Sequence, residues 1–468
     1  MTVERRRTLL LLLALATLAV LAYLPTIAQP FIEDDYWNIS LSWKFGNLSA
    51  WRDMISSEFR PRITSIWYMD AAWHAFGLRP APYYALNIGL HVLCVWLVFA
   101  LGCWRRLGYR LSAWAAAFFA VYEGHQEAIM WFSACNETLQ FLFGVAALAC
   151  WLRFLDSGAR RVVGLRPCDL APMPGRLPTL AVPNGTTTVR EWPAAEKQYL
   201  TVTALAWYAA AVACFALALA SKESAVVFGP LFLLPLVPVA ARRRAPWVLP
   251  LLAMAALGVW SIFALRARSF RFHDGSFSLH APIWLVWPDN LARLFWAWGL
   301  AGLICVAAWG WKKHRPIVIL GLVWAGATLL PYCFLLYWKR VPSRQFYLPS
   351  LGVAWIVAAA ILTLRERFPR ARRGLTAAVV AVMLLANIGT LWTKKRRQFL
   401  DRAQPTEQLI ALARRSAGPI YVRCFPRDRV IAEQAVVVGA SRPATDLVWD
   451  EAEARARGAT ASFCYLGK

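Results

Sequence analysis

Three consecutive acids, Glu33, Asp34 and Asp35, directly follow the first long apolar segment of the chain. Tyr36 and Trp37 come next, and membrane proteins concentrate these residue types at the boundary between membrane and water. The chain has 26 acidic residues against 51 basic ones, so three acids together at such a boundary are conspicuous. Ionisable groups at this depth usually carry function, and a carboxylate here suits the removal of a proton from a hydroxyl group. The alternative is a solvated loop or helix cap.

Cationic side chains lie at the ends of other apolar segments that we predict to share a face with these acids. Arg344, Lys222 and Arg60 are candidates for binding a phosphate group, because guanidinium and ammonium groups stabilise a multi-oxygen anion. Two alternatives stay open. Lys222 and Glu223 would form a neutralised pair in a tight turn, and Arg344 would anchor a helix end at the membrane interface.

A third group of polar residues follows the apolar run that begins at residue 111. His125 and Glu127 are candidates for binding a divalent cation or an acceptor, with Glu33 as a further candidate. One histidine and one carboxylate make an incomplete metal site, so hydrogen bonding between helices is the alternative. A divalent cation is the one cofactor that these residues suggest.

The composition identifies a polytopic membrane protein. Hydrophobic residues make up 59% of the 468-residue chain and charged residues 16%, whereas charged residues average about 25% in soluble domains. The net charge of +25 does not indicate nucleic acid, because the basic residues form short clusters at loop ends. There they set topology and contact membrane lipids. Of the ten cysteines, Cys424 and Cys464 in the polar tail can form a disulfide if the tail lies outside the cytosol.

The apolar segments predict an all-α polytopic protein with about eleven transmembrane helices. The basic residues 5–7 place the start of an uncleaved first helix inside, so the three acids emerge on the outer face. The run 111–155 is long enough for two spans, with a turn near residues 123–130 and a short first helix. The predicted spans are 8–24, 83–104, two within 111–155, 199–220, 224–241, 247–265, 294–311, 316–337, 346–364 and 375–392.

This topology divides the chain into a membrane domain, residues 1–393, and a small α/β appendage, residues 394–468, on the extracytoplasmic side. Residues 29–80 form the first outer loop, in which 39–45 and 50–55 are predicted as helices in the interface. Residues 156–198 form a cytoplasmic loop, and 266–293 form an outer loop. One cluster, the basic residues 394–397, would then lie outside, against the usual distribution of positive charge.

The order of these motifs resembles that of GT-C-type glycosyltransferases, in particular the bacterial relatives of transmembrane O-mannosyltransferases that carry tetratricopeptide repeats. The resemblance covers about residues 8–365. It rests on the acidic pair after the first helix, Arg60-Pro61-Arg62-Ile63-Thr64 leading into residues 84–91, His125-Gln126-Glu127 followed by Trp131, Ser221-Lys222-Glu223, and residues 344–352. The chain departs from that family at Tyr122-Glu123, where His-Pro is usual, at Cys135-Asn136-Glu137, and in lacking the repeats.

The resemblance implies a GT-C-like fold and an integral membrane glycosyltransferase of a bacterial inner membrane. Its donor would be a polyisoprenyl-phosphate sugar and its acceptor a glycan, lipid or protein on the extracytoplasmic side. The chemistry then assigns Asp34 as the base of an inverting displacement, with Asp35 assisting or orienting the acceptor. A transporter or lipid flippase for a lipid-linked sugar is the alternative, because charges inside membranes also mark substrate pathways. An inactive scaffold that binds lipid-linked sugars is a third interpretation.

Overall fold

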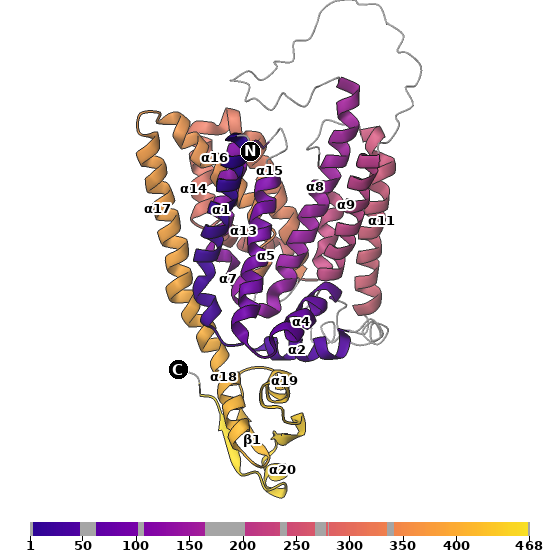
Figure 1. Cartoon of the computed structure of the whole chain (residues 1–468), viewed down its shortest axis with the longest axis vertical. Coiled ribbons are helices and arrows are strands. Elements are labelled where there is room, and N and C mark those ends of the chain that lie inside the picture. The colour runs from indigo at the N-terminus through magenta and orange to yellow at the C-terminus, as the bar shows by residue number, and fades with distance from the viewer. Residues whose placement is uncertain are drawn as a thin grey trace, which may run out of the picture.

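The computed structural model describes residues 3–46, 62–101, 107–163, 202–234, 241–266, 278, 280–334 and 341–466. A bundle of long helices forms the body, and a small unit of helices and strands lies below its lower end (Figure 1). In the described part of the chain, six helical segments are long and apolar enough to cross a membrane: Glu4–Ala28, Pro80–Ala100, Phe132–Asp156, Val202–Ser221, Trp298–Phe334 and Arg372–Arg415. The architecture is therefore that of a helical membrane protein. The predicted number of eleven spans is not confirmed by this measure.

The helices of the first part of the chain are α1 (Val3–Tyr23), α2 (Asp34–Phe45), α4 (Ile63–Phe76), α5 (Pro80–Ala100), α6 (Tyr109–Val121), α7 (Gln126–Met130), α8 (Cys135–Val163), α9 (Val202–Ser221), α10 (Phe228–Leu231) and α11 (Ala241–Arg266). Those of the second part are α13 (Ile283–Phe295), α14 (Trp298–Cys305), α15 (Trp311–Leu329), α16 (Ser350–Arg367), α17 (Arg372–Thr390) and α18 (Arg396–Arg415).

The segment predicted as the first outer loop folds into helices at the lower end of the bundle, where α2 and α4 pack together (Figure 1). α2 contains the predicted segment 39–45 but begins earlier, at Asp34, because two acids in a first turn are favoured by the helix dipole. The sequence analysis did not predict α4, and the predicted helix 50–55 lies outside the described residues. Trp43 and Trp73 pack against each other with ring centroids 4.9 Å apart, as suits helices at a membrane surface.

The apolar run 111–155 divides as predicted. α6 is short, and the turn consists of η4 (Glu123–His125) and α7. α8 then continues to Val163, past the predicted end of its span. The rest of the predicted cytoplasmic loop, residues 164–198, lies outside the described residues.

Two predicted segments need correction. The span predicted at 224–241 begins as the 3-10 turn η6 (Glu223–Val227) and the short helix α10, where Pro230 lacks the N–H that a regular helix needs. Residues 235–240 lie outside the described residues. The predicted outer loop 266–293 contains most of α13, whose exposed Trp284 and Leu285 and buried Asn290 give it two different faces.

α14 and α15 are the two arms of a hairpin around η7 (Val306–Gly310). Along the first arm, Gly302 lies against Ile356 and Gly310 against Thr363, and on the second arm Gly321 returns to Gly352. A Cβ on Gly352 would collide with the backbone of Gly321, so these glycines permit the close approach of α15 and α16. This reversal agrees with the prediction of separate spans at 294–311 and 316–337.

α16 is the central helix. Its residues from Ser350 to Ile361 are all buried, and it packs against α6, α14, α15 and α17. A helix that is apolar on every side is stable only when other helices surround it. Because α16 begins directly after η9 (Ser343–Phe346), the best-packed helix of the bundle fixes the position of Arg344.

The appendage, defined here as residues 396–466, combines α18 with β1 (Ile420–Cys424), α19 (Arg429–Ala440), β2 (Leu447–Val448), α20 (Glu451–Ala456) and β3 (Ala461–Cys464). Its parallel sheet has the order β2-β1-β3, with Ile420 paired to Leu447 and Ala461. The predicted α/β class of the tail is correct. α17, η10 (Leu391–Lys395) and α18 follow one another without a break, so the last long helix of the bundle extends into the appendage.

Candidate functional site

The acidic turn, Glu33, Asp34 and Asp35, lies at the start of α2. Asp35 is fully buried, and its carboxylate accepts hydrogen bonds from the backbone N–H of Ile32 at 2.8 Å and from the N–H and Oγ of Ser133 at 2.8 and 2.6 Å. Burial raises the pKa of Asp35 to about 7, because the loss of solvation outweighs these hydrogen bonds. Asp34 is partly exposed.

The two aspartates therefore differ in accessibility. The Oδ1 atom of Asp35 accepts from Ser133 and its Oδ2 atom accepts from the backbone N–H of Ile32, so both carboxylate oxygens hold the local backbone. Asn38 extends this network by donating to the Oγ of Ser133 at 3.0 Å and to the backbone oxygen of Asp34 at 2.9 Å. Of the two aspartates, only Asp34 is exposed in part to solvent.

Glu33 is buried and joins the acidic turn to the last helix and the appendage. Arg402 of α18 donates to both of its carboxylate oxygens, at 3.0 and 2.9 Å. Arg427, in the loop after β1, makes a further ion pair at 2.7 Å. Such two-point arginine contacts are among the stronger charged hydrogen bonds in proteins. The residue predicted as a candidate ligand for a metal or an acceptor thus has its charge neutralised twice.

Trp131 lies at the centre of the site. Its indole N–H donates to the backbone oxygen of Ile32 at 3.3 Å, directly before the acidic turn. The guanidinium groups of Arg344 and Arg402 lie over its ring, 4.8 and 4.4 Å from the centroid. These are favourable cation–π distances. One side chain therefore brings the acidic turn and two arginines from distant parts of the chain together.

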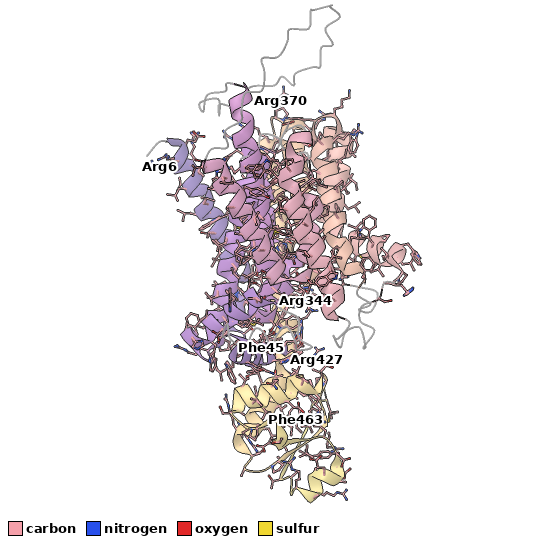
Figure 2. The ribbon with its side chains drawn as sticks, turned by 90° about the vertical axis from the view of Figure 1, so that its right-hand side faces the viewer. Arg6, Phe45, Arg344, Arg370, Arg427 and Phe463 are labelled. Carbon is pink, nitrogen blue, oxygen red and sulfur yellow. A yellow bond between two sulfur atoms is a disulfide. The ribbon has the colours of Figure 1, made fainter. Side chains whose placement is uncertain are left out.

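Arg344 and Arg402 differ in charge compensation. Arg402 is paired with Glu33 and also lies 3.7 Å from Glu127. Arg344 is partly buried, and in the described part of the chain no carboxylate forms an ion pair with its guanidinium. Figure 2 shows Arg344 at the lower end of the bundle and Arg427 just below it, where bundle and appendage meet.

The turn at 123–130 forms hydrogen bonds with η9, the turn that carries Arg344, and with the start of α16. His125 is fully buried and its Nε2 lies 2.6 Å from the Oγ of Ser350, at the start of α16. Glu127 accepts a hydrogen bond from the backbone N–H of Arg344 at 3.1 Å. His125 and Glu127 therefore serve different partners and do not converge. In the described residues, no three acidic, histidine or cysteine side chains are arranged to hold a metal ion.

Lys222 belongs to a second, neighbouring cluster, formed with Glu137, Tyr332 and the pair Arg62 and Glu223. Lys222 is buried in an ion pair with Glu137, and its ammonium group lies 4.7 Å from the ring centroid of Tyr332. Arg62 pairs with Glu223 at 3.2 Å. Arg60, the third predicted phosphate ligand, lies outside the described residues.

The structure thus brings Asp34, Glu33, Glu127 and Arg344 together around Trp131. Arg344 is also close enough to Lys222 for their like charges to repel, so the two clusters adjoin. The sequence analysis missed Arg402, Arg427 and Ser133. No signal in one sequence separates Arg402 or Arg427 from the many other arginines of the tail. Trp131 was noted only as part of a motif.

Comparison with known proteins supports the fold. No family model matches the chain, and no curated protein matches it in sequence. Among solved structures, the apo oligosaccharyltransferase from Archaeoglobus fulgidus aligns with 93% of this chain at a TM-score of 0.52 and 13% identity. The same archaeal enzyme, AglB, in complex with an inhibitory peptide and dolichol-phosphate, aligns with 94% of this chain at a TM-score of 0.50 and 12% identity. ArnT from Cupriavidus metallidurans, bound to undecaprenyl phosphate, aligns at a TM-score of 0.42 and 13% identity, covering 97% of this chain and 89% of that one.

The chain has a fold similar to that of the archaeal oligosaccharyltransferase and spans 64% of the length of that enzyme. This agrees with the GT-C-like class that the motifs predicted. The similarity includes nearly the whole of this chain, so the membrane bundle and the appendage are both part of it.

Proposed function

We propose that the protein is an integral membrane glycosyltransferase that transfers a sugar from a polyisoprenyl-phosphate donor to an acceptor hydroxyl. The observation that carries the proposal is that a partly exposed acid and a cation without a carboxylate partner lie in the same site. Asp34 is partly exposed, and Arg344 lies nearby over Trp131 without a carboxylate partner among the described residues. The fold shared with an oligosaccharyltransferase whose structure is a complex with dolichol-phosphate supports the choice of donor.

In the proposed reaction, the carboxylate of Asp34 takes the proton of the acceptor hydroxyl as its oxygen attacks the anomeric carbon. A new bond forms between that carbon and the acceptor oxygen, and the bond to the phosphate oxygen breaks with inversion. The electron pair leaves with the lipid phosphate, whose negative charge the guanidinium of Arg344 stabilises. Asp35, held by Ser133, keeps the turn in place.

The other predicted phosphate ligands have weaker support. Lys222 is already paired with Glu137, so its charge is compensated inside the protein. Arg60 is still proposed as a phosphate ligand. A divalent cation would need a set of ligands that the described residues do not form.

The lower end of the bundle is proposed to face the extracytoplasmic side of a bacterial inner membrane. Arg6 and Arg370, which belong to the basic runs at residues 5–7 and 365–373, lie at the opposite, upper end (Figure 2). Basic residues near short loops favour the cytoplasm. The disulfide between Cys424 and Cys464 in the appendage fits an oxidising compartment. The relation to the O-mannosyltransferase relatives is kept as part of this proposal.

The test uses purified protein and a panel of radiolabelled polyisoprenyl-phosphate sugars, with release of free lipid phosphate and transfer of label as readouts. The proposal predicts release of the phosphate with at least one donor, and loss of this release in Asp34→Asn. A second assay follows movement of the same lipids across reconstituted vesicles. Movement across the bilayer with no cleavage of any donor would contradict the proposal and favour a flippase.

A further inference from the structure

The appendage packs directly on the acidic turn. Phe31, Tyr36 and Ile39, on both sides of the turn, form one apolar cluster with Ile410 of α18 and Val438 of α19. The hydroxyl of Tyr36 also donates to Glu407 of α18 at 2.5 Å. Because the two parts share a buried core, the appendage lies directly against the acidic turn, with α19 below α2 (Figure 1).

The backbone at Glu33 has an uncommon conformation. Its φ of 44° lies in the left-handed region, which non-glycine residues seldom adopt. Such a conformation persists only where surrounding contacts fix it. Arg402 and Arg427 supply those contacts, since both hold the buried carboxylate of Glu33. Asp34 is the next residue along the chain.

We propose that Arg402 and Arg427 are positioning residues, through which the appendage holds Glu33 and so keeps Asp34 in its reactive place relative to Arg344. This inference rests on the proposed function. The bundle alone would leave the charge of Glu33 uncompensated beside Asp34. The appendage is then required for the chemical step.

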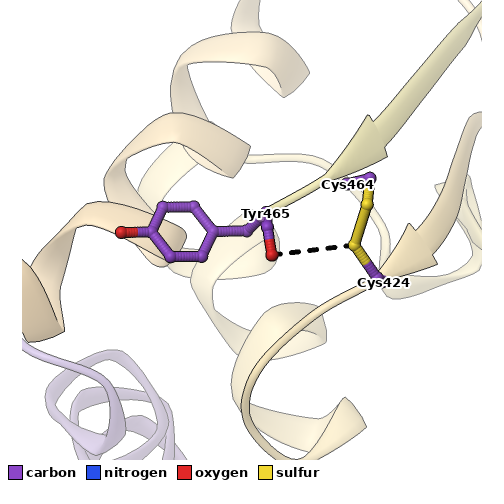
Figure 3. Close-up of a disulfide and its surroundings, with 3 residues drawn as sticks. All are labelled: Cys424, Cys464 and Tyr465. Carbon is purple, nitrogen blue, oxygen red and sulfur yellow. Dashed lines mark hydrogen bonds between the residues drawn. A yellow bond between two sulfur atoms is a disulfide. The ribbon is translucent and has the colours of Figure 1, made fainter. Parts of the chain in front are cut away.

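The disulfide contributes to this arrangement. Cys424 ends β1 and is bonded to Cys464, the last residue of β3. Arg427 lies three residues after Cys424. Figure 3 shows the two strand ends joined in this way, with the sulfur of Cys424 lying 3.7 Å from the backbone oxygen of Tyr465. The loop that carries Arg427 therefore starts from a fixed point.

Arg427 offers the clean test, because its side chain is 42% exposed and its removal leaves no buried gap. Arg427→Ala removes the contact with Glu33, and Arg427→Lys keeps a cation within reach of the same carboxylate oxygen. Arg455→Ala is the matched control, since Arg455 forms an exposed ion pair with Glu451 elsewhere on the appendage. Full-length variants are compared in transfer kinetics and in amide hydrogen exchange of the segment 31–38.

We expect Arg427→Ala to lower kcat by about tenfold or more, with the donor KM within about twofold of wild type. Arg427→Lys should recover most of the lost kcat, and Arg455→Ala should match wild type. Amide exchange in segment 31–38 should rise only in Arg427→Ala. Equal kcat in Arg427→Ala and Arg455→Ala would overturn the inference. If the wild-type protein transferred no sugar, the proposed function would fail, and exchange that stayed unchanged in Arg427→Ala would still reject the positioning role separately.

Discussion

Two charged clusters adjoin at the lower end of the bundle and compensate their charges differently. In the Lys222 cluster each cation has a carboxylate partner, because Lys222 pairs with Glu137 and Arg62 with Glu223. Around the acidic turn, Glu33 is compensated by Arg402 and Arg427, whereas Arg344 has no carboxylate partner in the described residues.

This difference separates charges that hold the fold from charges that are available for chemistry. A buried pair whose partners satisfy each other has little attraction left for a ligand, and removal of one partner leaves a costly lone charge. A cation without a partner at membrane depth is expensive to keep and usually has a functional reason.

The largest effect is expected at Asp34. Replacing Asp34 by Asn keeps the shape and removes the proton acceptor, so turnover should fall by about 10²- to 10⁴-fold. Thermal stability and donor binding should change little, because the side chain is partly exposed. Steady-state transfer kinetics measure the change. Turnover of Asp34→Asn within a factor of a few of wild type would remove Asp34 from the mechanism.

Lys222 should matter mainly for stability. Lys222→Met leaves the buried charge of Glu137 without its partner, and breaking such a pair costs about 3–5 kcal/mol of unfolding free energy. Thermal unfolding in detergent measures the loss. The double variant Lys222→Met with Glu137→Gln should regain most of it, since neither charge remains. A stable Lys222→Met protein with greatly weakened donor binding would instead return Lys222 to the list of phosphate ligands.

The disulfide should stabilise the appendage. It closes a segment with a sequence separation of 40, and chain entropy alone gives a loss of up to about 4 kcal/mol on its removal. Cys464→Ser should therefore increase proteolysis and amide exchange in β1 and β3, while α16 stays protected. Cys214→Ser, a free cysteine of α9, is the control. Equal protection of the strands in both variants would show that the disulfide adds nothing.

Asp35 should give a smaller, pH-dependent effect. Its pKa in the folded protein is raised to about 7, so the folded state holds the proton more tightly than the unfolded chain. The resulting stability is complete below about pH 4 and is lost as the pH rises through about 7. Between about pH 6 and pH 8 the free energy of unfolding should fall by about 1 kcal/mol. Asp35→Asn should flatten this dependence, and wild-type stability that does not change over the same interval would show that the carboxylate is ionised throughout.

Much of the fold could be predicted from the sequence, because apolar runs and basic clusters report directly on the membrane. The short helix before the turn at 123–130 and that turn itself were predicted on this basis. Helices in which polar and apolar residues mix were harder to predict. Examples are α4 and α13, which lack the apolar length of a membrane span. The eleven-span count was built on length alone and has not been confirmed.

The candidate site was only partly predictable. The acidic turn, Arg344 and the turn with His125 and Glu127 were found because charge is rare in this chain. Their roles depend on partners that are far away in sequence. Glu33 could not be recognised as a positioning residue without Arg402, which lies 369 residues further along the chain. The ion pair of Lys222 could not be predicted from its neighbours in the sequence either, because its partner Glu137 belongs to another helix.

Equilibrium binding of a labelled polyisoprenyl phosphate to wild type, Arg344→Ala and Asp34→Asn tests the central claim most directly, because it requires no knowledge of the sugar or the acceptor. The account predicts that Arg344→Ala binds about 10- to 100-fold more weakly, as expected for the loss of charged hydrogen bonds. Asp34→Asn should bind within about twofold of wild type, since its role lies in the chemical step. Equal affinity of Arg344→Ala and wild type for the lipid would contradict the account.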